Sequence, residues 1–176
     1  MAFADPIKNI EELNLREGMR VADLGSGAGH YSFEAARRVG DEGRVFAVDV
    51  QKDLLTKVQS EARRQNLHHV EIIWGDFEKI GGSKLSDQSV DAVILSNVLF
   101  QVEKKETLLE EVKRIIRPGG EVLIVDWSDS FSGLGPRLED VFPKEKAKEL
   151  FQKNGFKIER ELFPGDNHYG FVAKVI

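Results

Sequence analysis

Cysteine is absent from this 176-residue chain. None of these residues can therefore form a disulfide, a thiolate metal site or a cysteine nucleophile. Long apolar runs are also missing, so the sequence predicts neither a membrane-spanning segment nor a signal peptide at the N-terminus. The hydrophobic share of 41% and the charged share of 31% are typical of a globular protein. We expect a single domain, residues 1–176, without integral membrane association and located in the cytoplasm.

Positive charge is in short supply as well. The chain has 25 Lys and Arg residues against 30 Asp and Glu residues, a net charge of −5. Nucleic-acid binding usually needs clustered positive charge, so no nucleic-acid partner is expected. The pairs Arg37-Arg38 and Arg63-Arg64 fit solvated helix faces. His68 and His69 are adjacent in a predicted turn, which is a poor arrangement for metal ligands, and no metal site is expected.

Hydrophobic periodicity alternates between strand-like and helix-like segments. The predicted strands cover residues 20–24, 45–50, 70–74, 90–95, 122–125, 156–163 and 169–175. The predicted helices cover residues 5–15, 28–39, 54–66, 103–116 and 144–153, and the first of them, in the N-terminal segment 1–17, places Ile7, Ile10 and Leu13 on one face. This alternation favours a doubly wound α/β fold with a parallel sheet, closed by an antiparallel hairpin.

The ends of the first two strands carry the clearest functional signal. Ligands of open α/β sheets bind beyond the carboxyl ends of the strands. The first strand ends in Asp23 and three alternating glycines, Gly25, Gly27 and Gly29, a turn that lets a ligand approach the main chain closely. Asp49 ends the second strand, where a carboxylate can accept both hydroxyls of a ribose. Together they predict a ligand of the adenosine type.

The glycine spacing distinguishes between nucleotides. A dinucleotide fingerprint, G-x-G-x-x-G, requires glycine at position 30 after Gly25 and Gly27, but the chain has His30 there. Asp23 would repel a pyrophosphate, whereas it would attract the ammonium and sulfonium groups of S-adenosylmethionine. We therefore favour S-adenosylmethionine, and an NAD-dependent oxidoreductase stays open as an alternative.

Five motifs in order carry a family resemblance: residues 21–29, 46–49, 75–77, 91–97 and 117–120. On these motifs, residues 18–124 resemble the class I S-adenosylmethionine-dependent methyltransferases, in particular the small-molecule (type 11) group that includes the ubiquinone and menaquinone C-methyltransferases. The resemblance implies a seven-stranded, mostly parallel sheet whose last strand is antiparallel and lies beside the fifth. It also implies S-adenosylmethionine as cofactor, S-adenosylhomocysteine as product and a small-molecule methyl acceptor.

The same resemblance implies roles for the residues of the glycine-rich turn. Gly25, Gly27 and Gly29 would pack under the methionine part and the ribose of the cofactor. Asp23 would help to hold the methionine end.

Further cofactor contacts are implied at the later strand ends. Asp49, followed by Val50, would bind the ribose hydroxyls. Asp76 would accept a hydrogen bond from the adenine amino group, with Phe77 beside the ring. Asn97 would line the methionine pocket.

Methyl transfer from a sulfonium depends mainly on positioning, so a general base is optional. The fifth strand ends in Asp126-Trp127 and lacks the Asp-Asn pair by which catechol-type enzymes hold magnesium. Without cysteine, the cytosine-C5 and arsenite methyltransferase mechanisms are excluded, which leaves metal-free transfer to oxygen, nitrogen or carbon. Candidates for a base are His30, Asp126, His168 and Tyr169.

The acceptor is expected near the loop of residues 127–143 and the turn of residues 164–168. Trp127, Phe131, Leu134 and Phe142 make the loop apolar, which favours an apolar, aromatic or membrane-derived acceptor. Alternatively, these side chains pack onto the core. A non-catalytic, cofactor-binding partner subunit is a further alternative, and the oligomeric state is open.

Overall fold

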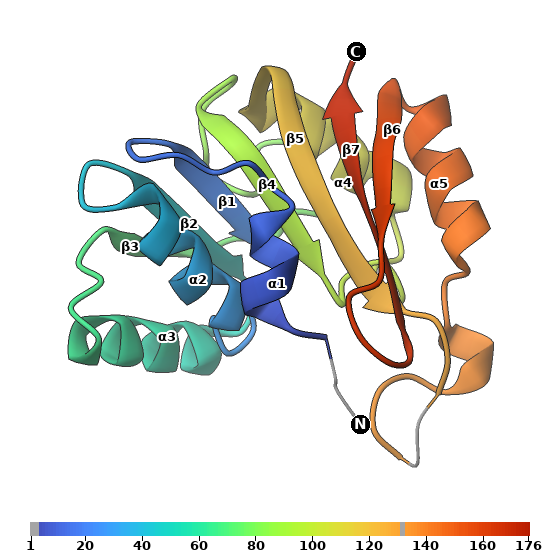
Figure 1. Cartoon of the computed structure of the whole chain (residues 1–176), viewed down its shortest axis with the longest axis horizontal. Helices are drawn as coiled ribbons and strands as arrows, with labels where there is room; N and C mark the ends of the chain where they lie inside the picture. Colours follow the sequence, from blue (N-terminus) through green and yellow to red (C-terminus); the bar gives the residue numbers. More distant parts are fainter. Residues whose placement is uncertain (1–3, 131–132) are drawn as a thin grey trace.

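The seven strands form one mixed sheet with helices on both faces (Figure 1). The structure is a computed structural model that describes residues 4–130 and 133–176. The strand order is β3-β2-β1-β4-β5-β7-β6. The strands are β1 (Arg20–Leu24), β2 (Arg44–Asp49), β3 (Val70–Trp74), β4 (Val90–Ser96), β5 (Ile116–Trp127), β6 (Phe156–Leu162) and β7 (His168–Val175). The helices are α1 (Pro6–Glu11), α2 (His30–Val39), α3 (Lys52–Arg64), α4 (Lys105–Ile115) and α5 (Lys144–Lys153), with a 3-10 turn at Leu138–Asp140.

The direction of the strands confirms the predicted fold class. β3, β2, β1, β4 and β5 are parallel, and β7 runs antiparallel between β5 and β6. The central strands are buried on both faces because helices cover both, which explains their continuous apolar runs. In this arrangement β1 to β5 end at the same edge of the sheet, where β7 begins.

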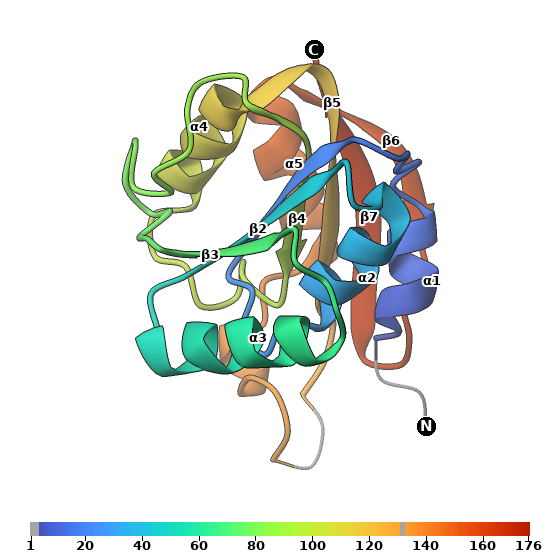
Figure 2. The ribbon, with the colours of Figure 1, turned by 90° about the vertical axis from the view of Figure 1, so that its left-hand side faces the viewer.

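Two hydrophobic clusters separate the faces of the sheet. Side chains of α1, α2 and α3 pack on one face, and side chains of α4 and α5 pack on the other. Figure 2 shows α4 and α5 on one side of the sheet and α1 and α2 on the opposite side. None of the helices in the described part of the chain has the length and apolar character needed to cross a membrane.

The structure corrects two details of the sequence analysis. The fifth strand begins at Ile116, not at residue 122, because its first residue pairs with Val90 before a register break restores pairing at Ala92–Glu121. Ile7 is 53% exposed, whereas Ile10 and Leu13 are buried. The helix α1 ends at Glu11, so Leu13 reaches the core from the turn that follows and the three residues do not share one helical face.

The apolar side chains of the loop predicted over residues 127–143 lie in two environments, some buried and some exposed to solvent. Trp127 belongs to β5 and is 9% exposed, and Phe142 packs against the core. Leu134 is 53% exposed, and Phe131 lies outside the described residues. Trp127 and Phe142 thus pack inward, whereas Leu134 remains exposed, as does Leu138 of the same loop at 68%.

Candidate cofactor and acceptor site

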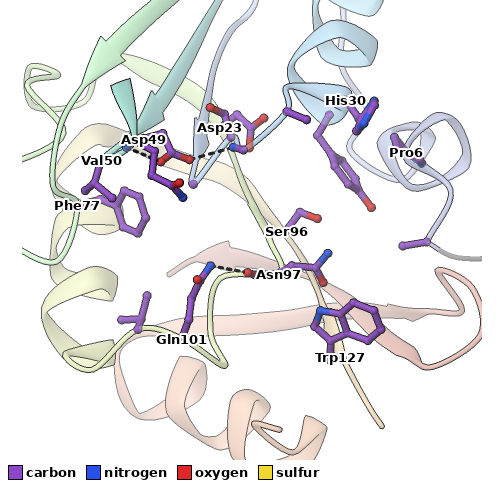
Figure 3. A pocket seen from close by; sticks show the side chains of 18 of the residues that line it. Pro6, Asp23, His30, Asp49, Val50, Phe77, Ser96, Asn97, Gln101 and Trp127 are labelled. Atoms are coloured by element: carbon purple, nitrogen blue, oxygen red, sulfur yellow. Dashed lines mark hydrogen bonds between the residues drawn. The ribbon is translucent and has the colours of Figure 1, made fainter. Parts of the chain in front are cut away.

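A cavity of about 460 Å³ opens at the carboxyl ends of the parallel strands. Figure 3 shows Asp23 and Asp49 at one end of it, Trp127 and Asn97 at the other, and Pro6 and His30 along one side. Eight of the nine residues predicted to bind the cofactor line this cavity, and Gly29 is the exception. His30 and His168 also line it, whereas Asp126 and Tyr169 do not.

The three glycines of the β1–α2 turn differ in what surrounds them. A Cβ on Gly25 would lie 2.7 Å from Cγ2 of Val98, and a Cβ on Gly29 would lie 2.9 Å from the Phe33 ring. A Cβ on Gly27 would meet no protein atom within 4 Å, although its φ is +52°. Packing against the protein therefore accounts for Gly25 and Gly29, and only Gly27 presents an open face to the cavity.

Asp49 fixes the shape of the glycine turn. Its Oδ2 accepts a hydrogen bond from the backbone N–H of Gly27 at 2.9 Å, and its Oδ1 accepts one from the N–H of Gln51 at 2.9 Å. Asp49 is only 6% exposed. A carboxylate has about four lone-pair positions, so two remain for donors that enter the cavity, such as a pair of ribose hydroxyls.

Asp23 is the second buried acid of the site and is 1% exposed. Its Oδ2 accepts a hydrogen bond of 2.6 Å from Ser32 Oγ, and its buried Oδ1 has no partner among the described residues. Burial, together with the charge of Asp49 and against the Ser32 bond, raises the pKa of Asp23 to about 7. A cationic ligand at Oδ1 would compensate for the cost of ionising this acid.

Asp76 and Phe77 follow β3 and close the side of the cavity next to Asp49. Asp76 Oδ2 lies 2.8 Å from Lys79 Nζ, and this contact lowers the pKa of Asp76. Its Oδ1 accepts from the Glu78 N–H at 3.1 Å. Phe77 is 8% exposed and packs near Gly25, so its ring forms part of a fixed wall.

Asn97 begins the loop after β4 in a left-handed conformation with φ +56°. Its N–H donates to Val125 O at 2.8 Å, and its C=O accepts from Gln101 Nε2 at 2.9 Å (Figure 3). The buried Oδ1 has no partner among the described residues. The backbone is thus held while the side-chain amide remains available to a ligand.

Asp126 and Tyr169 lie behind the cavity wall. Asp126 Oδ2 accepts from the Leu99 N–H at 2.7 Å, and Oδ1 accepts from the Trp127 N–H at 2.8 Å. Burial raises the pKa of Asp126 to about 6, against the effect of these bonds. Burial also raises the pKa of Tyr169. Asp126 therefore anchors the loop that carries Asn97 and has no access to a ligand.

Several cavity residues were not predicted. Pro6, from the start of α1, and Gln101, from the loop after β4, reach the cavity only through the tertiary fold. Tyr31 lines it as well, and its Oη accepts from Asn9 Nδ2 at 2.9 Å. The position of Tyr31 in the first turn of α2, beside the glycines, could have indicated a place in the site. The helical periodicity instead predicted that Tyr31 faces the core.

Of the adjacent residues His68 and His69, His68 is exposed and His69 has a structural role. His69 Nε2 lies 2.8 Å from Ala36 O, and the ring is buried under α2. Across residues 4–130 and 133–176, no three His, Asp or Glu side chains come together as a set of metal ligands.

Comparisons with known proteins identify the family. A family model described as "Methyltransferase domain" matches residues 15–163. The chain is 36% identical over 109 residues to an arsenite methyltransferase of Halobacterium salinarum, a match that covers 62% of this chain and 27% of that protein. It is 24% identical over 198 residues to a demethylmenaquinone methyltransferase of Oceanobacillus iheyensis, covering 93% of this chain and 82% of that protein.

A solved structure agrees with these matches. A SAM-dependent methyltransferase from Aquifex aeolicus superposes with a TM-score of 0.88 at 29% identity, over 98% of this chain and 90% of that one. The matched family, the strand order and the aspartates at the strand ends point to the same class of protein. The chain belongs to the methyltransferase domain family and is an S-adenosylmethionine-dependent methyltransferase.

Proposed function

We propose that this cavity binds S-adenosylmethionine with its ribose at Asp49, its adenine between Asp76 and Phe77, and its amino-acid end at Asp23. The observation that carries the proposal is the buried Oδ1 of Asp23, which has no partner among the described residues. Asp23 lines the same cavity as Asp49. Gly27 supports it, because its open face lets the ligand contact the main chain. Asn97 supplies a further free amide beside the amino-acid end.

The bound cofactor supplies a methyl group on a sulfonium that is reactive without a metal. The residues of the chain have the task of orientation and of excluding water. Asp49 holds the glycine turn in shape through the Gly27 N–H, and Asp126 holds the loop of Asn97 through the Leu99 N–H. These bonds keep the walls of the cavity in place around both reactants.

The acceptor is proposed to be a small molecule that enters at the Trp127 end of the cavity and is methylated on oxygen, nitrogen or carbon. The buried indole favours an apolar or aromatic acceptor, in line with the relatives named demethylmenaquinone methyltransferases. Arsenite is a poor candidate, because these 176 residues contain no thiol to bind a soft metalloid. The net charge of −5 disfavours a nucleic acid, and the composition suits a cytoplasmic enzyme.

Calorimetry with S-adenosylhomocysteine tests the cofactor site. Asp49→Ala should weaken binding by about 10- to 100-fold, because charge-assisted hydrogen bonds contribute ~1.5–3 kcal/mol. Asp53→Ala, which removes an exposed acid on α3, is the matched control and should leave binding unchanged. Equal affinities of both variants would place the ribose elsewhere.

The acceptor is sought by release of S-adenosylhomocysteine across a panel of phenols, quinols, amines and carboxylates. Turnover of a panel member identifies the class of acceptor. Cofactor binding without turnover of any panel member would support the non-catalytic partner subunit instead.

A further inference from the structure

His168 occupies a distinctive position in the wall at the acceptor end. It is the first residue of β7, it is 6% exposed, and it lines the same cavity as Asp23 and Asp49. Its ring lies against the Trp127 indole, with ring centroids 4.2 Å apart and an interplanar angle of 36°. The imidazole is therefore held by packing, next to the place proposed for the acceptor.

The hydrogen bonds of His168 determine which nitrogen carries the proton. Nδ1 lies 3.0 Å from the backbone oxygen of Asp166. A carbonyl oxygen can only accept, so Nδ1 must carry the proton and Nε2 of the neutral ring carries a lone pair. Nε2 is buried and has no partner among the described residues. Leaving a buried polar atom without a partner is unfavourable, and a donor on a ligand would remove that cost.

The surroundings keep this ring neutral. Burial lowers the pKa of His168, and the bond to Asp166 O only partly opposes this. Asp126 and Tyr169, on the same two strands, face the other side of the sheet. The other titratable groups that line the cavity are Asp23, His30, Tyr31, Asp49, Asp76 and Glu78. Asp166 lies in the adjoining turn, where its backbone oxygen contacts His168 Nδ1.

We propose that His168 Nε2 is the proton acceptor of the methyl-transfer reaction, and that the methyl acceptor is a planar aromatic molecule bearing a hydroxyl group. This inference rests on the proposed function. Trp127 lines the cavity beside His168 and gives an aromatic ring an apolar neighbour, and Nε2 suits a donor at the edge of that ring. Nε2 is covered in the free protein, so the adjacent side chains must shift when the acceptor enters, as interface side chains commonly do.

The proton and electron balance of the step is simple. In transfer to the hydroxyl oxygen of the acceptor, this oxygen bonds to the methyl carbon while the carbon–sulfur bond breaks, and the electron pair of that bond stays on sulfur. The hydroxyl proton of the acceptor moves to Nε2, and the resulting imidazolium releases it to water after the products leave. No oxidant, reductant or metal takes part.

The first test is nitrogen NMR of the histidine side chains in the wild-type protein, free and loaded with S-adenosylhomocysteine. His168→Asn identifies the His168 signals. We expect Nδ1 protonated, Nε2 unprotonated and a pKa below the ordinary value of about 6.5. The opposite tautomer, or a charged ring at neutral pH, would overturn the proposal even if the variant fails to fold.

The second test compares binding of 2-naphthol and quinoline to the protein loaded with S-adenosylhomocysteine. The two bicyclic aromatics have similar shapes, but only 2-naphthol can donate to Nε2. We expect 2-naphthol to bind roughly five- to tenfold more tightly, the value of one hydrogen bond, and His168→Asn to abolish the preference. His68→Asn, on the exposed surface, should keep it.

The outcomes separate this inference from the proposed function. Failure of S-adenosylhomocysteine to bind would contradict the proposed function. Normal cofactor binding with equal affinity for the two aromatics, or no affinity for either, would contradict the role of His168 alone. A preference lost in His30→Asn and kept in His168→Asn would assign the proton acceptor to His30.

Discussion

Trp127 and His168 face each other across the antiparallel pair of β5 and β7, with ring centroids 4.2 Å apart. The preceding residue of β5, Asp126, pairs with Tyr169, and Tyr169 belongs to the hydrophobic cluster under α4 and α5. Successive side chains of a strand point to opposite faces of the sheet. One pair therefore lines the cavity, and the neighbouring pair supports it from behind.

The loop after β5 holds Trp127 in place through Gly135. A Cβ on Gly135 would lie 2.8 Å from the indole ring, whereas a Cβ on Gly133 would have no neighbour within 4 Å. Both residues have a positive φ, so Gly135→Ala and Gly133→Ala should each lose about 1 kcal/mol of stability from backbone strain. Only Gly135→Ala should also change the tryptophan fluorescence and near-UV circular dichroism and weaken binding of an aromatic acceptor. The same spectra for both variants would show that Gly135 does not position Trp127.

The glycine turn offers a test that separates ligand contact from folding. Gly27→Ala should weaken binding of S-adenosylhomocysteine, because its Cβ would project into the open cavity. Its stability should fall only by the backbone strain of the positive φ. Gly25→Ala should lower the melting temperature more, because its Cβ would lie 2.7 Å from Val98. Calorimetry and thermal unfolding on both variants measure the two effects. Greater loss of stability in Gly27→Ala than in Gly25→Ala would contradict the arrangement.

The raised pKa of Asp23 predicts two opposite effects of pH. Affinity for S-adenosylhomocysteine should rise roughly tenfold as pH increases through about 7, because the ionised acid attracts the ligand ammonium. The ligand-free protein should lose stability over pH ~4 to 7, because ionisation in the fold is less favourable than in the unfolded chain. Asp23→Asn should remove both effects. 5′-Methylthioadenosine, which lacks the ammonium group, should bind without the pH dependence, and a similar dependence for it would rule out this contact.

Glu111 stabilises the segment that precedes β4. It is fully buried in α4, accepts from the N–H groups of Gly81 and Ser83, and pairs with Arg114 at 2.8 Å. Burial works against its charge, but the bonds from Arg114 and Ser83 prevail and lower the pKa to about 2. Its contribution to stability is present above the unfolded pKa of about 4.5 and is lost as pH falls toward 2.

Glu111→Gln should therefore lower the free energy of unfolding by about 2 kcal/mol at neutral pH and make unfolding in acid less steep. Glu110→Gln, exposed on the same helix, is the control and should behave like the wild type. Urea titrations at several pH values provide the measurement. Equal stability of the two variants would show that the Glu111 contacts are not stabilising.

The types and order of the helices and strands could be predicted from the sequence because they depend on local periodicity. The strand ends at Asp23 and Asp49 could be predicted for the same reason, since a turn after an apolar strand is a local feature. The hydrophobic pattern of residues 117–120 did not indicate that β5 starts before them, because that depends on pairing with Val90 on another strand.

The sequence by itself determined the chemistry available at each strand end: acids for a cationic nucleoside, glycines for a tight turn, and no thiol. Only the tertiary structure decided which of these groups face the ligand. All four candidate bases lie within two residues of the end of a strand or helix, but the β5–β7 register turns His168 toward the cavity and Asp126 and Tyr169 away from it. The physical reason is the two-residue repeat of a strand, in which a shift by one position moves a side chain to the other face of the sheet.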